Sequence, residues 1–189
     1  MPASTADGEI VVNGMSNAMR NSPYANAGIV AQVHPSDLAD YQKHGVLAGL
    51  RFQQDVERMA HNGLFAPAQR LVDFVQARAS ASLPATSYLP GVASASLHDL
   101  LPPFISRSLQ AAFVQFDKKM HGYLSAEAVI LAVESRTSSP VRIPRRSDTL
   151  QHIQLARLYP CGEGAGYAGG ITSSAIDGVN CAGKIVGEQ

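Results

Sequence analysis

The chain is organised around one stretch near its end, Leu158-Tyr-Pro-Cys-Gly-Glu-Gly-Ala-Gly-Tyr-Ala-Gly-Gly-Ile171. An apolar entry leads into five glycines within nine residues, and a run of small residues suited to a helix follows. Glycine adopts positive φ without strain and lets a backbone come close to a ligand. A helix starting here would aim free N–H groups and the positive end of its dipole at the loop. The stretch therefore predicts a site for an anion or a polar ring.

The same glycines read as GxGxxG between Gly164 and Gly169. In a dinucleotide-binding fold that pattern opens a βαβ unit and an acidic residue follows at the end of the next strand. Here only one helix is expected between the glycines and Gln189. We therefore expect the loop to close a site that other segments begin.

Three segments resemble a bacterial family, the uncharacterised FAD-dependent dehydrogenases, also called NAD(FAD)-utilising dehydrogenases. One is the glycine-rich stretch, with Ser174-Ala175 and Asp177-Gly178 behind it. The others are Glu134-Ser-Arg-Thr-Ser-Ser-Pro-Val-Arg-Ile143, and Asn13-Gly14-Met15-Ser16 with Ala25-Asn26-Ala27 behind it. They occur in the family's order. The family's initial βαβ unit, with its own glycine fingerprint, has no counterpart in this sequence, so the chain resembles the C-terminal portion of such an enzyme.

The resemblance implies FAD as cofactor and three groups of binding residues. They are Gly162, Glu163, Gly164, Gly166, Tyr167, Gly169, Gly170 and Ile171; Arg136, Thr137, Ser138 and Ser139; and Asn13, Gly14, Met15 and Ser16. The acid in the glycine loop would bond a ribityl or ribose hydroxyl, although it could instead hold the loop by accepting from glycine N–H groups. The tyrosine would line one side of the flavin ring, or it could be an ordinary packed aromatic residue. The Asn-Gly pair is also explained by a tight turn. No catalytic residue is identified.

The function that follows is the C-terminal part of an FAD-dependent oxidoreductase, passing hydride between the flavin and a nicotinamide or small organic substrate. A separate N-terminal FAD-binding unit is the expected partner. Two alternatives stay open. The chain could be a truncated or split-gene fragment that acts as an interaction partner without catalysis of its own. It could also be an anion-binding module that holds a phosphate in its glycine loop.

Composition limits the remaining classes of function. The 189 residues are 46% hydrophobic and 16% charged with zero formal net charge, which is typical of a soluble globular protein without a nucleic-acid footprint. No apolar run approaches the roughly 20 residues that span a membrane. The first residues lack signal-peptide features, so we expect a cytoplasmic protein. The two cysteines and six histidines show no metal-binding spacing, so no metal is expected.

Hydrophobic patterning predicts an α/β fold, mixed α+β as an isolated fragment. The resemblance implies a partial FAD/NAD(P)-binding fold with a mainly helical inserted region. We expect a strand pair and loop near the flavin in residues 1–33, a substrate or cap region in 34–125, and the C-terminal part of the FAD-binding domain in 126–189. Expected strands are 9–13, 27–33, 128–133 and 141–143. Expected helices are 46–62, 67–78, 104–120 and one from 171 onward, whose small face (175, 178, 179 and 182) would pack on a sheet.

Overall fold

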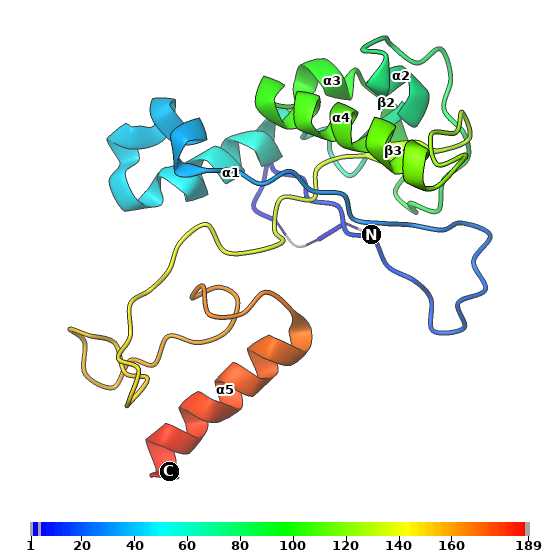
Figure 1. Ribbon diagram of the computed structural model, residues 1–189. Coiled ribbons are helices and arrows are strands. Elements are labelled where there is room, and N and C mark those ends of the chain that lie inside the picture. The colour runs from blue at the N-terminus through cyan, green and yellow to red at the C-terminus, as the bar shows by residue number, and fades with distance from the viewer. Residues whose placement is uncertain (1, 4, 188–189) are drawn as a thin grey trace. The chain divides into compact units, whose positions relative to one another are not determined.

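A computed structural model describes residues 2, 3 and 5–187 of the protein (Figure 1). The chain forms two compact units: unit 1 comprises Met1–Asp37 and Gln54–Ser135, and unit 2 comprises Leu38–Gln53 and Arg136–Gln189. Helices accompany a small three-stranded sheet, so the predicted mixed class, a partial α/β fold, is confirmed. The three-part division by role stays a prediction. Residues 1 and 4 of the first predicted part, and residues 188 and 189 of the last, lie outside the described residues.

The sheet of unit 1 has the order β2-β1-β3. Its central strand, β1 (Ala66–Arg70), runs parallel to β2 (Val92–Ser94) and antiparallel to β3 (Val129–Leu131). Ala68 lies opposite Ser94 on one side and Leu131 on the other. Ala66, Ala68 and Gln69 are fully buried. The sheet is short, and the helices around it supply the rest of the core.

The predicted helix at 67–78 is wrong, because its first residues form β1. Pro67 favours the first turn of a helix, and proline is rare in a central strand because it has no N–H to donate. Here its carbonyl still accepts a 3.1 Å hydrogen bond from the Ala132 N–H. The strand bonds both neighbours, so tertiary pairing outweighs the local preference. Only the five residues of α2 (Leu71–Val75) become helical.

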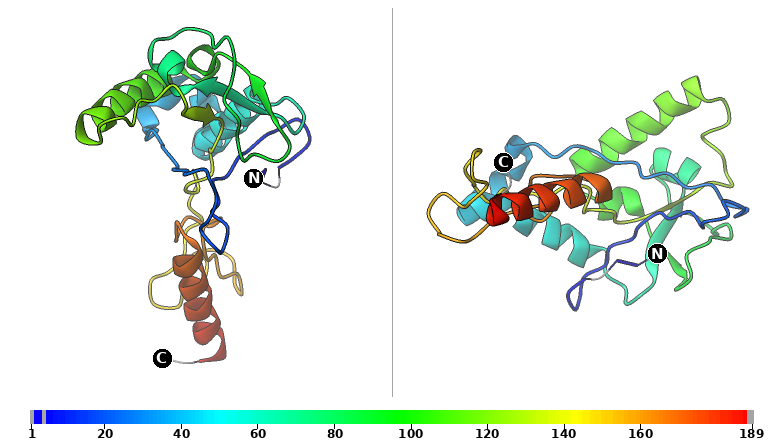
Figure 2. Two further views of the ribbon diagram at one scale, coloured as in Figure 1. Left: turned by 90° about the vertical axis from the view of Figure 1, so that its right-hand side faces the viewer. Right: turned by 90° about the horizontal axis from the view of Figure 1, so that it is seen from below.

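Helices α2, α3 (Leu97–Leu100) and α4 (Pro103–Lys119) gather around the sheet in each view (Figures 1 and 2). Helix α4 confirms the helix predicted from the Pro-Pro start and the helical spacing of apolar residues. Phe113 on α4 is buried and meets Phe74 of α2 edge to face, with ring centroids 6.1 Å apart. Aromatic pairs in this geometry add to the apolar area they bury. This contact fixes α2 against α4.

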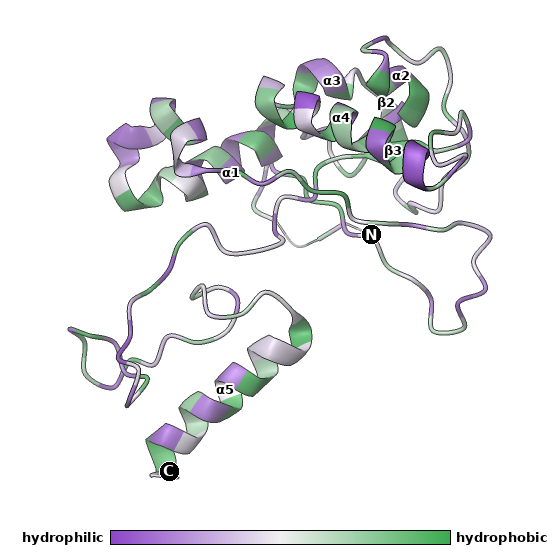
Figure 3. Cartoon of the chain, in the orientation of Figure 1, coloured by the Kyte–Doolittle hydropathy of each residue, from purple (hydrophilic) through white to green (hydrophobic). Residues whose placement is uncertain are grey.

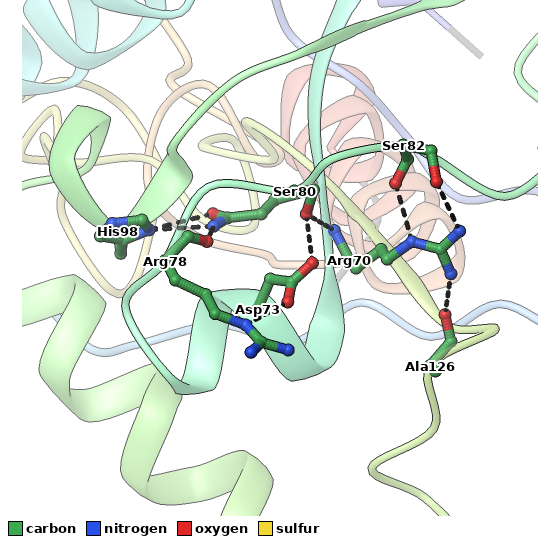
Figure 4. Close-up of polar contacts among 8 residues, drawn as sticks. Arg70, Asp73, Arg78, Ser80, Ser82, His98 and Ala126 are labelled. Carbon is green, nitrogen blue, oxygen red and sulfur yellow. Dashed lines mark hydrogen bonds and ion pairs between the residues drawn. The ribbon is translucent and has the colours of Figure 1, made fainter.

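The loop between α2 and β2 is tied to β1 by polar side chains (Figure 4). The Ser80 hydroxyl donates to Asp73 at 2.8 Å and accepts the Arg70 N–H at 3.0 Å. The Arg78 guanidinium bonds Asp73 at 2.6 Å, and that of Arg70 donates to the carbonyl and hydroxyl of Ser82. These hydrogen bonds hold the pKa of Asp73 below its ordinary value, the Ser80 hydroxyl contributing most and Arg78 next. The loop is therefore ordered by side chains without regular secondary structure.

The strands predicted at 9–13 and 27–33 do not form. Residues Ile10 to Val12 are buried, but their N–H groups bond separate partners: Ile10 bonds the Glu57 carbonyl at 3.2 Å and Val12 bonds that of Val133 at 2.8 Å. Residues 27–33 are mostly exposed and pair with no strand among the described residues. The apolar run Ile10–Val12 is buried, but an apolar run does not specify which backbone groups pair.

Unit 2 holds most of the 3-10 helix η1 (Pro35–Leu47), the first half of α1 (Ala48–Met59), and α5 (Ile171–Val186). Between α1 and α5 it consists of irregular chain, and the strand predicted at 141–143 is absent there. A Cβ at Gly49 of α1 would lie 3.1 Å from Cβ of Pro140, so this chain packs closely on the start of α1. In the described part of the chain, no helix is long and apolar enough to cross a membrane.

Helix α5 confirms the predicted terminal helix, and Gly187 ends it in the left-handed conformation, with φ of 85°. The prediction that the small face of α5 packs on a sheet is wrong. Val179 is 71% exposed, and Ala175 and Ala182 are also exposed. Cys181 and Asp177 instead face the irregular chain of unit 2. Small side chains permit close packing but do not require it, and the ion pair described below selects the covered face.

Candidate functional site

The glycine loop is a turn held by its own backbone. The Gly166 N–H donates to the Glu163 carbonyl at 2.9 Å, and the Tyr167 N–H donates to the Gly162 carbonyl at 3.0 Å. Gly162 and Gly166 have φ of 71° and 81°, the left-handed region that favours glycine. A Cβ at Gly166 would also lie 2.6 Å from the carbonyl oxygen of Val141. Two of the glycines are thus required by the turn and its close packing.

The structure brings the loop together with the predicted segment Arg136–Ser139. The Ser139 hydroxyl lies 3.3 Å from the Gly164 carbonyl, and the Ile143 N–H donates to the Ala165 carbonyl at 3.1 Å. A Cβ at Gly169 would lie 3.9 Å from the carbonyl of Thr137. Two of the three predicted groups therefore share one region of unit 2.

The third predicted group, Asn13 to Ser16, belongs to unit 1, and its place beside the flavin stays a prediction. A Cβ at Gly14 would lie 2.9 Å from Oδ1 of Asn26, so the two N-terminal segments that carry the resemblance pack against each other. A Cβ at Gly28, the residue after the second segment, would lie 3.3 Å from Oε2 of Glu134.

The head of α5 is open. Gly170 precedes the helix in an extended conformation, with φ of −161° and ψ of 164°, and no side chain caps the N-terminus. The first residue, Ile171, is 94% exposed. The first intrahelical bond runs from the Ser174 N–H to the Gly170 carbonyl at 2.9 Å. The first-turn N–H groups therefore carry the positive end of the helix dipole without a side-chain acceptor.

A bidentate ion pair fixes α5 to the irregular chain before the loop. Arg145 Nη2 lies 2.7 Å from Oδ1 of Asp177, and Nη1 lies 3.0 Å from Oδ2. Nη1 also donates to the Pro160 carbonyl at 2.7 Å, and the Gly162 N–H donates to Oδ2 of Asp177 at 2.9 Å. The two side chains are only 9% and 13% exposed. One carboxylate thus positions the helix, the arginine and the first glycine of the loop.

These contacts shift the pKa values of the groups involved. The hydrogen bonds from Arg145 lower the pKa of Asp177, and those to Asp177 raise the pKa of Arg145. Burial raises the pKa of the neighbouring Cys181 thiol. The ion pair is therefore fully charged near neutral pH. The sequence analysis missed this pair, because the partners lie 32 residues apart and neither carries a local pattern.

The ring of Tyr167 contacts two guanidinium groups. Cζ of Arg145 is 3.6 Å from the ring centroid and Cζ of Arg142 is 4.3 Å from it. The phenol donates to the Ile143 carbonyl at 3.0 Å. Stacking of cations on the ring face is favourable because of the ring quadrupole. The ring is held on its faces and at its hydroxyl, so its position is fixed by unit 2 itself.

Several polar groups of unit 2 near the glycine loop have no partner among the described residues. The side chain of Glu163 makes no hydrogen bond or ion pair among the described residues, so its carboxylate is free to accept from a ligand hydroxyl. A Cβ at Gly164 would meet nothing within 4 Å, which leaves open space beside the loop. The buried Ser174 hydroxyl also has no partner among the described groups. The accessible groups are the Glu163 carboxylate, an acceptor, and the first-turn N–H groups of α5, which are donors; the Ser174 hydroxyl is buried.

No group of three or more His, Cys, Asp or Glu residues that could hold a metal ion occurs within the described ranges. The donors at the glycine loop are instead peptide N–H groups and hydroxyls, which bind polar organic groups and anions. The site geometry therefore favours an organic ligand.

Comparison with known proteins places these features in context. A family model described as "FAD-dependent protein, C-terminal domain-like" matches residues 1–137. A protein of Clostridium beijerinckii (strain ATCC 51743 / NCIMB 8052), described as uncharacterised, is 37% identical over 190 residues, covering 97% of this chain and 35% of that protein. The chain thus spans about a third of the length of this curated relative. The glycine loop and α5 follow the part matched by the family model, and the similarity to the Clostridium protein extends to them.

Proposed function

The chain belongs to the family of FAD-dependent proteins, C-terminal domain-like, and from that premise we propose that it supplies the C-terminal wall of a flavin site in an oxidoreductase of the dehydrogenase type. The observation that carries this proposal is the open, uncapped head of α5 beside the glycine loop, with Arg136–Ser139 packed against the loop. FAD, when bound, would supply the hydride-transfer chemistry with a nicotinamide or a small organic substrate.

In this proposal the residues of the chain bind and orient the flavin. The first-turn N–H groups of α5 face the pyrimidine edge, where their partial positive charge favours negative charge on the ring. Glu163 accepts from a ribityl or ribose hydroxyl. The hydroxyls of Thr137 and Ser138 add further polar contacts. Gly166 acts indirectly, because its close approach to Val141 holds the loop in place.

A second candidate function is a fragment that acts through a partner and has no catalysis of its own. It is favoured by apolar residues that recur along α5, where Figure 3 shows green segments. Ile176, Val179 and Val186 are 56%, 71% and 72% exposed. Exposed apolar surface of this kind marks a contact with another polypeptide. The occupant we propose is the N-terminal FAD-binding unit, since the Clostridium relative carries about two-thirds of its length outside the matched part.

The substitution Ile171→Pro tests the flavin site at one peptide N–H. Proline is well tolerated at the first position of a helix, and Gly170 already has the extended conformation that a following proline requires. The variant therefore keeps α5 and removes one donor. The matched control is Ile171→Ala, which changes the same exposed side chain and keeps the N–H. Flavin fluorescence anisotropy during titration of FAD with the full chain gives the dissociation constant.

We expect Ile171→Pro to raise the dissociation constant by about two- to tenfold, the value of one hydrogen bond, and Ile171→Ala to leave it unchanged. Equal affinity of all three proteins would refute the role of the helix head. If the unmodified chain does not bind FAD at all, the fragment hypothesis is favoured. In that case the titration is repeated in the presence of the remaining two-thirds of the Clostridium relative. The fragment hypothesis then predicts that FAD binds only when both polypeptides are present.

A further inference from the structure

A pocket in unit 2 is lined mainly by residues 142–150. Its volume is about 780 Å³. The wall is completed by Val46 of η1 and by Tyr167, which follows the glycine loop. Pockets of about 300–1,000 Å³ are typical of sites for small organic molecules. The flavin site proposed above does not use this pocket. Tyr167 is the residue that the pocket shares with the segment of the glycine loop.

The charge of the pocket is positive. Three of its residues are arginines, and no Asp or Glu is among the described residues that line it. Arg145 is neutralised by Asp177. Arg142 and Arg146 are exposed, and neither forms an ion pair among the described residues. Two guanidinium groups without a counter-charge thus flank the pocket. Guanidinium groups match carboxylate and phosphate oxygens in geometry as well as in charge.

The remaining walls are apolar and held in place. Tyr167 is clamped by its two guanidinium contacts and its hydrogen bond to the Ile143 carbonyl. Leu150 has a φ of 59°, which a leucine rarely adopts. Two bonds maintain that conformation: the Leu150 N–H donates to the Arg146 carbonyl at 3.1 Å, and the Arg146 N–H donates to the Gln151 carbonyl at 2.8 Å. Strained backbone that the surroundings enforce is concentrated at ligand sites.

We propose that this pocket binds a small organic dianion, a compound with two negative charges on an apolar or aromatic body. Arg142 and Arg146 bind the charged groups, and Tyr167 and Leu150 contact the body. The charge of the ligand matches the two cations that have no counter-ion. The apolar walls explain why an organic body is needed in addition to the anion. This site is separate from the head of α5 and does not depend on the flavin proposal.

The test uses the full chain and two defined probes, phenyl phosphate and phthalate, in calorimetric titrations at low salt. At about pH 8 the phosphate monoester is a dianion, since its second pKa is about 6. We expect saturable binding of at least one probe. The double variant R142Q/R146Q should weaken it at least about tenfold, because each bond to a charged group makes a substantial contribution. Which probe binds more tightly distinguishes phosphate esters from dicarboxylates.

Three controls keep the proposal falsifiable. The double variant R107Q/R157Q removes the same charge at exposed arginines outside the pocket, and it should retain the affinity of the unmodified chain. Inorganic phosphate lacks the organic body and should bind about tenfold more weakly. Unsaturable binding, an equal loss in both double variants, or equal affinity for inorganic phosphate would each overturn the proposal. Circular dichroism confirms that the variants are folded.

Discussion

Asp177 offers the sharpest test of how unit 2 is held together. Its carboxylate accepts hydrogen bonds from both terminal nitrogens of Arg145 and from the N–H of Gly162. The substitution Asp177→Asn preserves the shape of the side chain but removes its charge. It also turns an amide NH₂ group toward a guanidinium that still donates to the Pro160 carbonyl. The variant therefore leaves a largely buried cation without its counter-ion.

The size of the effect follows from the burial of the pair. Removing one partner of a fully buried ion pair costs about 3–5 kcal/mol, whereas exposed pairs contribute at most about 1 kcal/mol. The two side chains here are 9% and 13% exposed and lie in a small unit, which places the expected loss between these limits. We expect the free energy of unfolding of unit 2 to fall by about 2 kcal/mol. For a unit of this size that loss lowers Tm by about 8–16 °C.

The assay must report on unit 2 alone. Amide hydrogen exchange at Gly162 and across α5 measures its opening, and the same exchange followed with rising temperature gives the Tm of unit 2. The control is Asp148→Asn, which removes the same charge from an exposed loop residue of the same unit, whose carboxylate accepts only from the next N–H. If Asp177→Asn leaves the amide exchange rates and Tm unchanged, or if the control changes them equally, the ion pair does not hold α5 to the rest of unit 2.

The pH dependence gives an independent check on the same carboxylate. Hydrogen bonds from Arg145 hold the pKa of Asp177 below its ordinary value of 3.8. Its contribution to stability is therefore fully present above that value and is lost as the pH falls through the lower folded-state pKa. The difference in the free energy of unfolding between the unmodified chain and Asp177→Asn should be constant from about pH 5 to 7 and shrink below the ordinary value. A difference that shrinks near neutral pH would contradict the assigned charge state.

Three further outcomes are expected. Gly166→Ala places a Cβ against a carbonyl at positive φ and should destabilise unit 2 by about 1–2 kcal/mol in urea unfolding, whereas Gly164→Ala, which meets no atom within 4 Å, should be neutral. Asp73→Asn loosens the loop between α2 and β2, so limited trypsin digestion followed by mass spectrometry should show faster cleavage after Arg78; an unchanged rate would contradict the network. The exposed Cys161 should react with a thiol reagent before the buried Cys181, whose pKa is raised by burial, and the reverse order would contradict the packing of α5.

Local signals in the sequence predicted the elements that need no distant partner. Pro102-Pro103 and a helical apolar stripe predicted α4, and the glycine loop with small residues behind it predicted α5. The structure also brings Arg136–Ser139 close to the glycine loop, while the flavin-binding role that the resemblance implies for both segments stays a prediction. Backbone freedom, helix starts and hydrophobic period are properties of neighbouring residues, so they can be read directly from the sequence.

Long-range contacts decided the rest. The residues of β1 have a local preference for a helix start, and only pairing with β2 and β3 makes them a strand. The apolar segment at Ile10–Val12 is buried as its pattern indicates, yet its N–H groups find single partners and form no ladder. Pairing depends on which segments meet in space, which a local pattern does not specify.

The sequence by itself determined the mixed class of the fold, the glycine turn and the helix that follows it. Only the tertiary structure decided which face of α5 is covered, because that choice rests on an ion pair between Arg145 and Asp177. It also gathered Arg142, Arg146 and Tyr167 around one pocket. The physical reason is the same in both cases. The energy of a charge depends on its distance from other charges and from water, and only folding sets those distances.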